Sequence, residues 1–324
     1  MKTLRIFVDF SAPADVMEIL RTGAAGHKLI FPRKPGASVL VKAEPDPEFA
    51  SVDVAFGQPD PQAVAHAKQL KWIHISTSGI TRYDTPEFRA LMAERQIAVS
   101  NSASVYSEAC AVHALTFMLA QARQLSVSLK TRTTHVSPAW HALRAASKTL
   151  RGETILIVGY GAIGRRLTEL LRPFEMQISA YRRNPRGDES VPLVSKGGMV
   201  QALGQADHVM NILPESGDTR HFFNRARLDA MKRGAIFYNI GRGATVDQQA
   251  LREGLASGAI GAAWLDVTEP EPLPEDHPLW SQPNCFITPH VAGGHADEAK
   301  TLVNHFLRNL DRYGRGEPLL DRVV

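Results

Sequence analysis

The sequence has few cysteines and no long apolar run. Only Cys110 and Cys285 occur among its 324 residues, and both lie in apolar stretches, as buried thiols do. Two cysteines form no disulfide framework, which excludes a small disulfide-stabilised domain. The first apolar run is broken at Asp9, too early for the core of a signal peptide, and no apolar stretch approaches the length of a membrane span. We therefore expect a cytoplasmic protein with no membrane partner.

The chain also has no strong excess of charge. Its formal net charge is +4, and its Lys and Arg residues are spread along the chain without interleaved aromatics, so no nucleic-acid partner is expected. Cys110 and His113 are one helical turn apart, but no second pair has the spacing of a zinc site, so no metal is expected. A hydrophobic share of 44% and a charged share of 22% are typical of a soluble globular protein.

Short apolar runs alternate with helical patterns along the chain, which predicts parallel sheets covered by helices. One sheet containing every strand would be unusually large, so we expect two domains. Strands are expected at residues 4–10, 38–41, 52–56, 72–76, 97–100, 155–158, 176–180, 208–212, 235–240, 260–266 and 285–288. Helices are expected at residues 14–22, 61–69, 86–95, 104–130, 165–171, 225–232, 248–257 and 296–313.

A Gly-x-Gly-x-x-Gly turn, formed by Gly159, Gly161 and Gly164, joins a strand to a helix. A strand, this turn, a helix and a second strand within about 30 residues are the context of a dinucleotide-binding fingerprint. The first glycine permits a tight turn, the second lets the backbone approach a pyrophosphate, and the third allows close helix packing. The alternative is a tight connection without a ligand.

The second strand of this unit leads into Tyr181, Arg182 and Arg183. An NAD site commonly has an acidic residue here, to accept a hydrogen bond from the ribose 2′-hydroxyl. Two guanidinium groups suit a 2′-phosphate instead, so NADP is the expected cofactor and NAD remains possible. The alternative is an exposed basic turn.

Three polar residues, Arg242, Glu271 and His290, follow expected strands in the second half of the chain. Because the carboxyl ends of strands line the ligand crevice of an open α/β sheet, all three could face one cofactor. Taken singly, Arg242 could be a surface residue, Glu271 a solvated loop residue and His290 a turn residue.

These segments give the chain a resemblance to the D-specific 2-hydroxyacid dehydrogenases over almost its full length. Residues 239–243, 266–272 and 288–294 look like the family's catalytic Arg, Glu and His segments and occur in the same order. The resemblance implies that Arg242 binds the substrate carboxylate and polarises the ketone, that His290 transfers the proton, and that Glu271 orients the imidazole. It also implies that backbone N–H groups near Ser78, Gly79 and Ile80 hold the substrate carboxylate.

The same resemblance implies an architecture. A Rossmann-type, doubly wound parallel-sheet cofactor domain, residues 103–291, would be inserted into a smaller flavodoxin-like α/β substrate domain, residues 1–102 and 292–324, with the active site in the cleft between them. Residues 123–151 resemble the family's dimerisation region, so a homodimer is expected. The cofactor-binding residues would be Gly159, Gly161, Ala162, Ile163, Gly164, Tyr181, Arg182, Arg183, Leu213, Pro214, Ile240, Asp266 and Gly293, with Asp266 fixing the nicotinamide carboxamide.

Two departures from the family pattern leave the substrate open. Thr81 stands where many relatives have Asp, and Val112 stands where a Glu commonly precedes the helix His. The expected activity is hydride transfer between NADPH or NADH and a small 2-oxo acid, such as glyoxylate or hydroxypyruvate. The alternatives are an NAD-dependent dehydrogenase of another 2-hydroxy acid and a nucleotide-sensing, corepressor-like binding protein.

Overall fold

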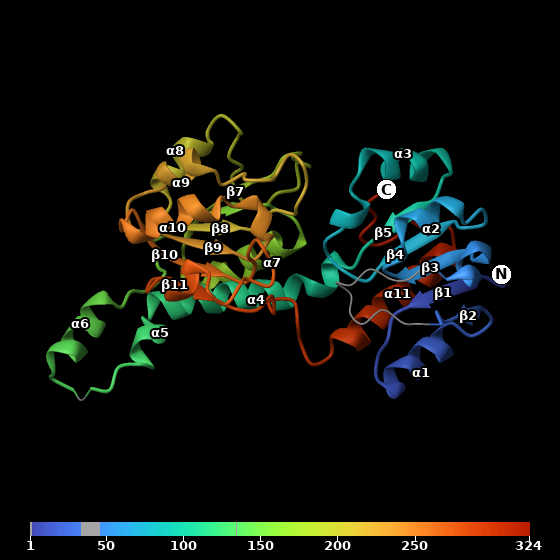
Figure 1. Ribbon diagram of the computed structural model, residues 1–324, viewed down its shortest axis with the longest axis horizontal. Coiled ribbons are helices and arrows are strands. Elements are labelled where there is room, and N and C mark those ends of the chain that lie inside the picture. The colour runs from blue at the N-terminus through green and yellow to red at the C-terminus, as the bar shows by residue number, and fades with distance from the viewer. Residues whose placement is uncertain (1, 34–45, 134) are drawn as a thin grey trace. The chain divides into compact units, whose positions relative to one another are not determined.

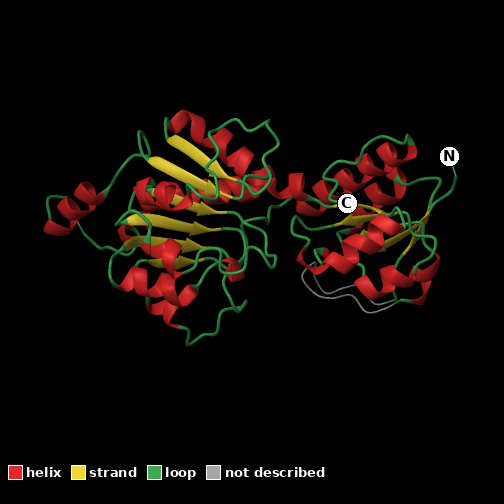
Figure 2. Ribbon diagram, turned by 90° about the horizontal axis from the view of Figure 1, so that it is seen from above, coloured by secondary structure: helices red, strands yellow, loops and turns green. Residues whose placement is uncertain are grey.

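The computed structural model describes residues 2–33, 46–133 and 135–324 (Figure 1). The chain forms two compact units: the first comprises Met1–Tyr106 and Gly294–Val324, and the second comprises Ser107–Gly293. Each contains a parallel sheet covered by helices, as Figure 2 shows. The expected fold class, two parallel-sheet α/β domains, is confirmed. The expected boundaries fell after residues 102 and 291, and the assignment of the units to substrate and cofactor stays a prediction.

The first unit has a five-stranded sheet in the order β2-β1-β3-β4-β5, the strand order of flavodoxin-like folds. Helices α1 and α11 cover one face, and α2 and α3 contribute to the apolar cluster on the other. The strands are β1 (Arg5–Asp9), β2 (Lys28–Ile30), β3 (Val54–Gly57), β4 (Trp72–Ile75) and β5 (Ala98–Ser100). The helices are α1 (Ala14–Gly23), α2 (Pro61–His66), α3 (Pro86–Glu94) and α11 (Glu298–Gly314).

Two features of this sheet were not predicted. The first is strand β2, the second strand along the chain, which has only three residues and only one buried side chain, Ile30. The strand expected at residues 38–41 lies outside the described residues. The C-terminal segment runs antiparallel beside β5, where Val323 N–H donates to Val99 O at 2.8 Å and Arg322 forms a bridge with Ser100. Strand β2 was not predicted because three residues carry too little hydrophobic pattern to be identified as a strand.

The second unit has a six-stranded parallel sheet in the order β11-β10-β9-β8-β6-β7. The chain order reverses at β6, which has β7 on one side and β8 on the other, and such a switch point is where ligands of open α/β sheets bind. The strands are β6 (Thr154–Val158), β7 (Gln177–Tyr181), β8 (His208–Asn211), β9 (Ala235–Asn239), β10 (Ile260–Leu265) and β11 (Cys285–Ile287). The helices beside them include α7 (Ala162–Leu171), α8 (Met199–Gln205), α9 (Arg225–Asp229) and α10 (Gln248–Ala256).

The long helix expected at residues 104–130 is interrupted. Helix α4 (Ala103–Ala122) ends before Gln124, whose φ of 51° places it in the left-handed region, and α5 (Leu125–Ser128) follows. No glycine or proline marks this break, so the sequence pattern did not reveal it. A further helix, α6 (Pro138–Ala146), was missed, although the Ser137 hydroxyl accepts from Trp140 N–H as an N-cap.

Helix α4 is long and apolar enough, by length and composition, to cross a membrane. The expectation that no apolar stretch reaches that length was therefore wrong. Within the second unit, however, the Phe117 ring lies 5.2 Å from the ring of Trp264 on β10, and Gln121 accepts a hydrogen bond from the Trp264 indole at 2.8 Å. These are the contacts of a helix that packs in a protein core.

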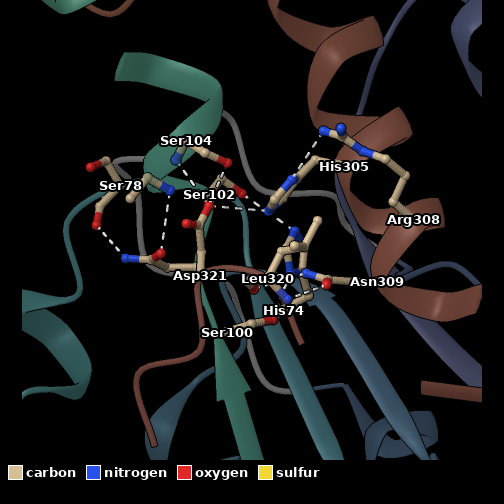
Figure 3. Close-up of polar contacts among 12 residues, drawn as sticks. His74, Ser78, Ser100, Ser102, Ser104, His305, Arg308, Asn309, Leu320 and Asp321 are labelled. Atoms are coloured by element: carbon tan, nitrogen blue, oxygen red, sulfur yellow. Dashed lines mark hydrogen bonds and ion pairs between the residues drawn. The ribbon is translucent and has the colours of Figure 1, made fainter. Parts of the chain in front are cut away.

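A buried histidine lies in the centre of the first sheet. His74 on β4 has no exposed surface, and its Nδ1 lies 2.8 Å from Ser100 Oγ, which also accepts from the Trp72 indole at 2.9 Å. Its Nε2 lies 3.4 Å from Ser102 Oγ, which donates to Ile75 O (Figure 3). Ser100 therefore donates to Nδ1, and the neutral imidazole with its proton on Nε2 satisfies this chain of bonds. Burial lowers the pKa of His74 to about 3.

This histidine makes stability depend on pH. Because its pKa is lower in the folded chain than in the unfolded one, the unfolded chain binds the extra proton, and stability is lost as pH falls from about 6.5 toward 3. We expect His74 to account for a loss of about 2 kcal/mol between pH 7.5 and pH 5. Urea unfolding of the wild type and of His74→Gln at both pH values measures this contribution. The pH dependence should shrink in His74→Gln and persist in the exposed-histidine control His66→Gln; equal pH dependence in all three proteins would refute the assignment.

Candidate active site

Two glycines of the fingerprint are required by contacts within the protein. Gly159 follows β6 with a φ of 105°, and a Cβ there would lie 2.7 Å from the carbonyl carbon and oxygen of Ile212, at the end of β8. A Cβ on Gly164, in the first turn of α7, would lie 3.0 Å from the Gly159 carbonyl oxygen. The exits of β6 and β8 therefore touch through their backbones, and α7 packs directly on the turn.

Gly161 differs from its two neighbours in the motif. It is the N-cap residue of α7, and a Cβ built on it would meet no atom within 4 Å. Among the described residues no side chain caps the helix, so the first N–H groups of α7 have no side-chain acceptor at the exit of β6. This arrangement fits a pyrophosphate, because a helix N-terminus stabilises negative charge and a missing Cβ allows close approach.

The two arginines after β7 have different surroundings. Arg182 is largely buried and its Nη1 donates to Glu189 at 3.0 Å, whereas Arg183 is exposed and pairs with the exposed Asp218 at 2.6 Å. Glu189 also accepts hydrogen bonds from the backbone N–H groups of Arg186 and Gly187. Together with the bond from Arg182, these hydrogen bonds lower the pKa of Glu189 to about 2. Among the described residues, Nε and Nη2 of Arg182 have no acceptor. Glu189 therefore fixes Arg182 while leaving part of its guanidinium available.

A buried pair of asparagines ties the ends of β8 and β9 together. Asn211 and Asn239 are register partners, and Asn211 Nδ2 donates to Asn239 Oδ1 at 3.0 Å and to Thr245 Oγ1 at 2.7 Å. Their oxygens accept from the N–H groups of Leu213 and Gly241, at 3.1 and 3.0 Å. Asn239 Nδ2 and Thr245 Oγ1 in turn donate to the backbone oxygen of Arg242. The network fixes the backbone from which the Arg242 side chain projects.

Arg242 lies between two glycines that permit no side chain. A Cβ on Gly241 would lie 2.5 Å from Leu213 O, and one on Gly243 would lie 2.0 Å from the carbonyl carbon and oxygen of Thr268. The Arg242 Nη1 donates to Gly241 O at 2.6 Å, and its Nε and Nη2 have no acceptor among the described residues. A half-buried guanidinium with free donors can bind a carboxylate and polarise a carbonyl group.

Glu271 and His290 form a hydrogen-bonded pair in the segments after β10 and β11. His290 Nδ1 contacts Glu271 Oε1, and both side chains are partly exposed. In this contact the Glu271 carboxylate accepts a hydrogen bond from Nδ1–H. The nitrogen that can exchange a proton with a ligand is therefore Nε2, which has no partner among the described residues. His290 has a φ of 53°, an uncommon backbone conformation for a residue other than glycine.

Asp266 holds the His290 segment in place. Its backbone oxygen accepts from His290 N–H at 2.9 Å, and its two carboxylate oxygens accept from Val291 N–H and Ala292 N–H, each at 2.9 Å. The Thr288 hydroxyl also donates to Oδ1, at 2.5 Å. With its side chain almost completely buried, Asp266 is observed to organise this loop, and its expected contact with the nicotinamide stays a prediction.

The remaining cofactor candidates occupy the same edge of the second sheet. Ala162 and Ile163 begin α7, and Pro214 O accepts from Thr219 Oγ1 at 2.7 Å in the loop after β8. Tyr181, Leu213 and Ile240 are buried, so only their backbones or small parts of their surfaces can face a ligand. Gly293 is the last residue of the second unit.

The substrate-binding candidates Ser78, Gly79 and Ile80 lie in the first unit, in the loop after β4. Their three carbonyl oxygens accept hydrogen bonds from Asn101 Nδ2, Thr77 Oγ1 and Tyr83 N–H, each at 2.7 Å. Within the described residues, by contrast, the N–H groups of these three residues donate to no acceptor. One side of the loop is therefore fully bonded, and the other presents backbone donors of the kind that bind anions.

Sequence reasoning missed the residues that support the site. These are Asn211, Asn239 and Thr245 behind Arg242, Glu189 behind Arg182, and Gln248, which bonds both backbone groups of Glu269 in the loop before Glu271. A signal existed for the two asparagines, since each interrupts an apolar strand at its carboxyl end. Nothing in the sequence indicated what Glu189 and Gln248 would contact.

The family described as "D-isomer specific 2-hydroxyacid dehydrogenase, NAD binding domain" matches residues 115–292. The chain belongs to this family. It is therefore an NAD(P)-dependent 2-hydroxyacid dehydrogenase, and the resemblance drawn from the sequence is confirmed.

Individual relatives agree with this assignment. The chain is 32% identical over 257 residues to the human glyoxylate reductase/hydroxypyruvate reductase, covering 79% of this chain and 77% of that protein. It is 30% identical over 292 residues to a glyoxylate reductase of Korarchaeum cryptofilum, covering 90% and 83%. Among solved structures, a D-isomer specific 2-hydroxyacid dehydrogenase from Xanthobacter autotrophicus, in complex with NADPH and MES, matches with a TM-score of 0.78, 25% identity and coverage of 100% and 98%.

The contrast among the motif glycines leads to a prediction about the dehydrogenase. A methyl group on Gly161 would meet no atom of the described residues within 4 Å. Gly161→Ala should therefore change the free energy of unfolding by no more than about 1 kcal/mol, the cost of an alanine at an N-cap. It should nevertheless raise the Kd of NADPH and NADH by about tenfold or more, because the methyl group would occupy the space that a pyrophosphate needs.

Fluorescence titration and urea unfolding measure the two effects separately. The matched control is Gly197→Ala in the same unit, where an added Cβ also meets nothing within 4 Å, and it should change neither quantity. Wild-type cofactor affinity in Gly161→Ala would show that this open space is not where the pyrophosphate binds.

Proposed function

We propose that this dehydrogenase reduces small 2-oxo acids, glyoxylate or hydroxypyruvate, with a preference for NADPH. One observation carries the proposal. Within the part of the chain that the structure describes, Arg242, which has unused hydrogen-bond donors, and His290, which is hydrogen-bonded to Glu271, both follow strands at the carboxyl edge of the sheet where helix α7 begins without a side-chain cap. The names of the human and archaeal relatives support the choice of substrate. An NAD-dependent reaction with another 2-hydroxy acid is the alternative within the same family.

The cofactor would bind at the carboxyl edge of the second sheet, around the β6 switch point. The N-terminus of α7 and Gly161 would bind the pyrophosphate, and Arg182 and Arg183 would bind the 2′-phosphate. The nicotinamide supplies the hydride when bound, and the chain's own residues must then bind the substrate and control its proton.

Substrate binding is assigned to two kinds of donor. Arg242 offers its free Nε and Nη2 groups, which suit a carboxylate next to a ketone oxygen. The N–H groups of Ser78, Gly79 and Ile80 offer neutral donors, each oriented by the hydrogen bond to the carbonyl oxygen of the preceding residue. A 2-oxo acid has a carboxylate next to a ketone oxygen, the two groups that Arg242 can bind, which is why this substrate class is favoured.

Proton transfer is assigned to His290. With Nδ1 bonded to Glu271, the imidazole is held with Nε2 available, so Nε2 would donate a proton to the ketone oxygen during reduction and accept one during oxidation. Glu271 stabilises the positive charge of the protonated ring.

We also propose a homodimer that uses residues 123–151, and a cytoplasmic location. The segment exposes several large apolar side chains, with Leu129 and Val136 exposed by 79% and 71%, more than a single protein surface usually leaves uncovered in one segment. Both cysteines are free thiols, as expected in a reducing compartment.

Turnover assays test the catalytic assignment. The wild type should reduce glyoxylate or hydroxypyruvate, and His290→Asn should lower kcat by at least about a hundredfold while leaving cofactor affinity nearly unchanged, because only the proton donor is lost. The exposed-histidine control His66→Asn should retain wild-type kcat. Wild-type turnover in His290→Asn would remove this residue from the mechanism, and a wild type that reduces no 2-oxo acid would overturn the proposed activity.

The cofactor preference is tested by comparing kcat/KM for NADPH and NADH. Charge-assisted bonds to a partly exposed phosphate should give a preference of about ten- to a hundredfold for NADPH, and added salt should reduce it. Changing Arg182→Gln and Arg183→Gln together should bring the ratio close to one while sparing kcat/KM with NADH. The control Arg172→Gln removes an exposed arginine after α7 and should leave the ratio intact; a ratio of one in the wild type would contradict the assignment.

A further inference from the structure

The loop after β4 has a regular pattern of hydrogen bonds on its carbonyl side. Ser76 O accepts from the Tyr106 hydroxyl at 3.0 Å, Thr77 O from Ser102 N–H at 3.1 Å, and Ser78 O from Asn101 Nδ2 at 2.7 Å. All three donors come from the start of α4 or the residues just before it. Each of these carbonyl groups is therefore fixed by the same short segment.

Fixing a carbonyl group also fixes the next N–H group. A trans peptide is planar, with its C=O and N–H pointing in opposite directions, and the peptide between Ser78 and Gly79 is trans, since the cis peptides of the described chain lie at Glu269-Pro270 and Glu271-Pro272. The bond from Asn101 to Ser78 O therefore determines where the Gly79 N–H points.

Asn101 is suited to this task because its side chain is held at both ends. It is 8% exposed, its Nδ2 donates to Ser78 O, and its Oδ1 accepts from Ala103 N–H at 3.2 Å at the start of α4. Exchanging the amide oxygen and nitrogen would place oxygen against oxygen at Ser78 and two donors together at Ala103. The orientation of the amide is thus specified by its two partners.

The backbone of Asn101 is fixed by the C-terminal segment. Its N–H donates to Asp321 O at 3.0 Å, while the Asp321 carboxylate accepts from Ser104 N–H at 2.9 Å and from Ser104 Oγ at 2.6 Å. Figure 3 shows Ser78, Ser104, His305 and Asp321 gathered at this point, with His305 Nε2 at 3.3 Å from Asp321 Oδ2. The backbone of Asn101 is therefore held by partners outside the loop that its side chain contacts.

We propose that Asn101 is a positioning residue for the substrate carboxylate, which it serves by turning the Ser78–Gly79 peptide so that the Gly79 N–H faces the ligand. The inference rests on the proposed function, because it takes residues 78–80 as the carboxylate site. Asn101 acts through the backbone, so its replacement should change substrate affinity more than the rate of the chemical step.

Two substitutions separate this role from support of helix α4. Asn101→Ala removes both side-chain bonds, whereas Asn101→Asp keeps an acceptor for Ala103 N–H and loses the donor to Ser78 O. Both should raise the KM of glyoxylate and the Kd of oxalate, a non-reducible dicarboxylate, by about ten- to a hundredfold, as expected for one hydrogen bond to a charged group. The kcat should change less than about threefold, because Arg242 and His290 are untouched.

The matched control is Asn284→Ala, which removes an amide that donates to Leu255 O and Gly261 O in the second unit, and it should leave both constants unchanged. Wild-type values in Asn101→Asp would overturn the proposal and assign the effect of Asn101→Ala to the helix. Wild-type values in both variants would also overturn it.

A structural measurement keeps the inference separate from the proposed function. If the wild type neither reduces glyoxylate nor binds oxalate, the proposed function fails, and the crystal structure of ligand-free Asn101→Asp then decides the positioning role. A rotated Ser78–Gly79 peptide in that structure would support the proposal. An unmoved peptide would overturn it.

Discussion

The site depends on direct contact between the backbones of neighbouring strand exits. Gly159 touches Ile212, Gly241 touches Leu213, and Gly243 touches Thr268, each at distances that leave no room for a Cβ. The exits of β6, β8, β9 and β10 are therefore packed against one another in a fixed order. Because the peptide backbone has few soft degrees of freedom, the residues between these contacts are positioned as well, and Arg242 is one of them.

Backbone contacts alone would leave polar groups unsatisfied, and buried asparagines and carboxylates correct this. An unpaired buried amide or carboxylate destabilises a fold strongly, so Asn211, Asn239 and Asp266 are present only because each has partners for its polar atoms. Asp266 illustrates the consequence for function. An uncommon backbone angle such as that of His290 costs about 1–3 kcal/mol, and the N–H bonds to Asp266 from residues 290–292 offset that cost.

Much of this arrangement could be read from the sequence because it rests on local patterns. Ten of the expected strands correspond to observed ones, since buried parallel strands appear as short apolar runs. The Gly159 motif and the residues that follow strands were visible for the same reason. The partners of Asn211, Glu189 and Gln248 were not, because a side-chain contact between distant residues leaves no periodic signal. The break at Gln124 and the strand β2 were missed because each is too short, or too weakly marked, to disturb a pattern.

Both units fix the direction of backbone groups by hydrogen bonds and close contacts within the protein. In the second unit, glycines let backbones touch, and buried side chains fix the peptides between them. In the first, the carbonyl oxygens of residues 76–80 are bonded, so that the N–H groups opposite them keep their directions without a ligand. Donors held in this way lose little conformational entropy when an anion binds. In the second unit, the geometry of Arg242 and His290 likewise depends on buried residues behind them, above all Asn211, Asn239 and Asp266, whose hydrogen bonds fix the backbone from which those side chains project.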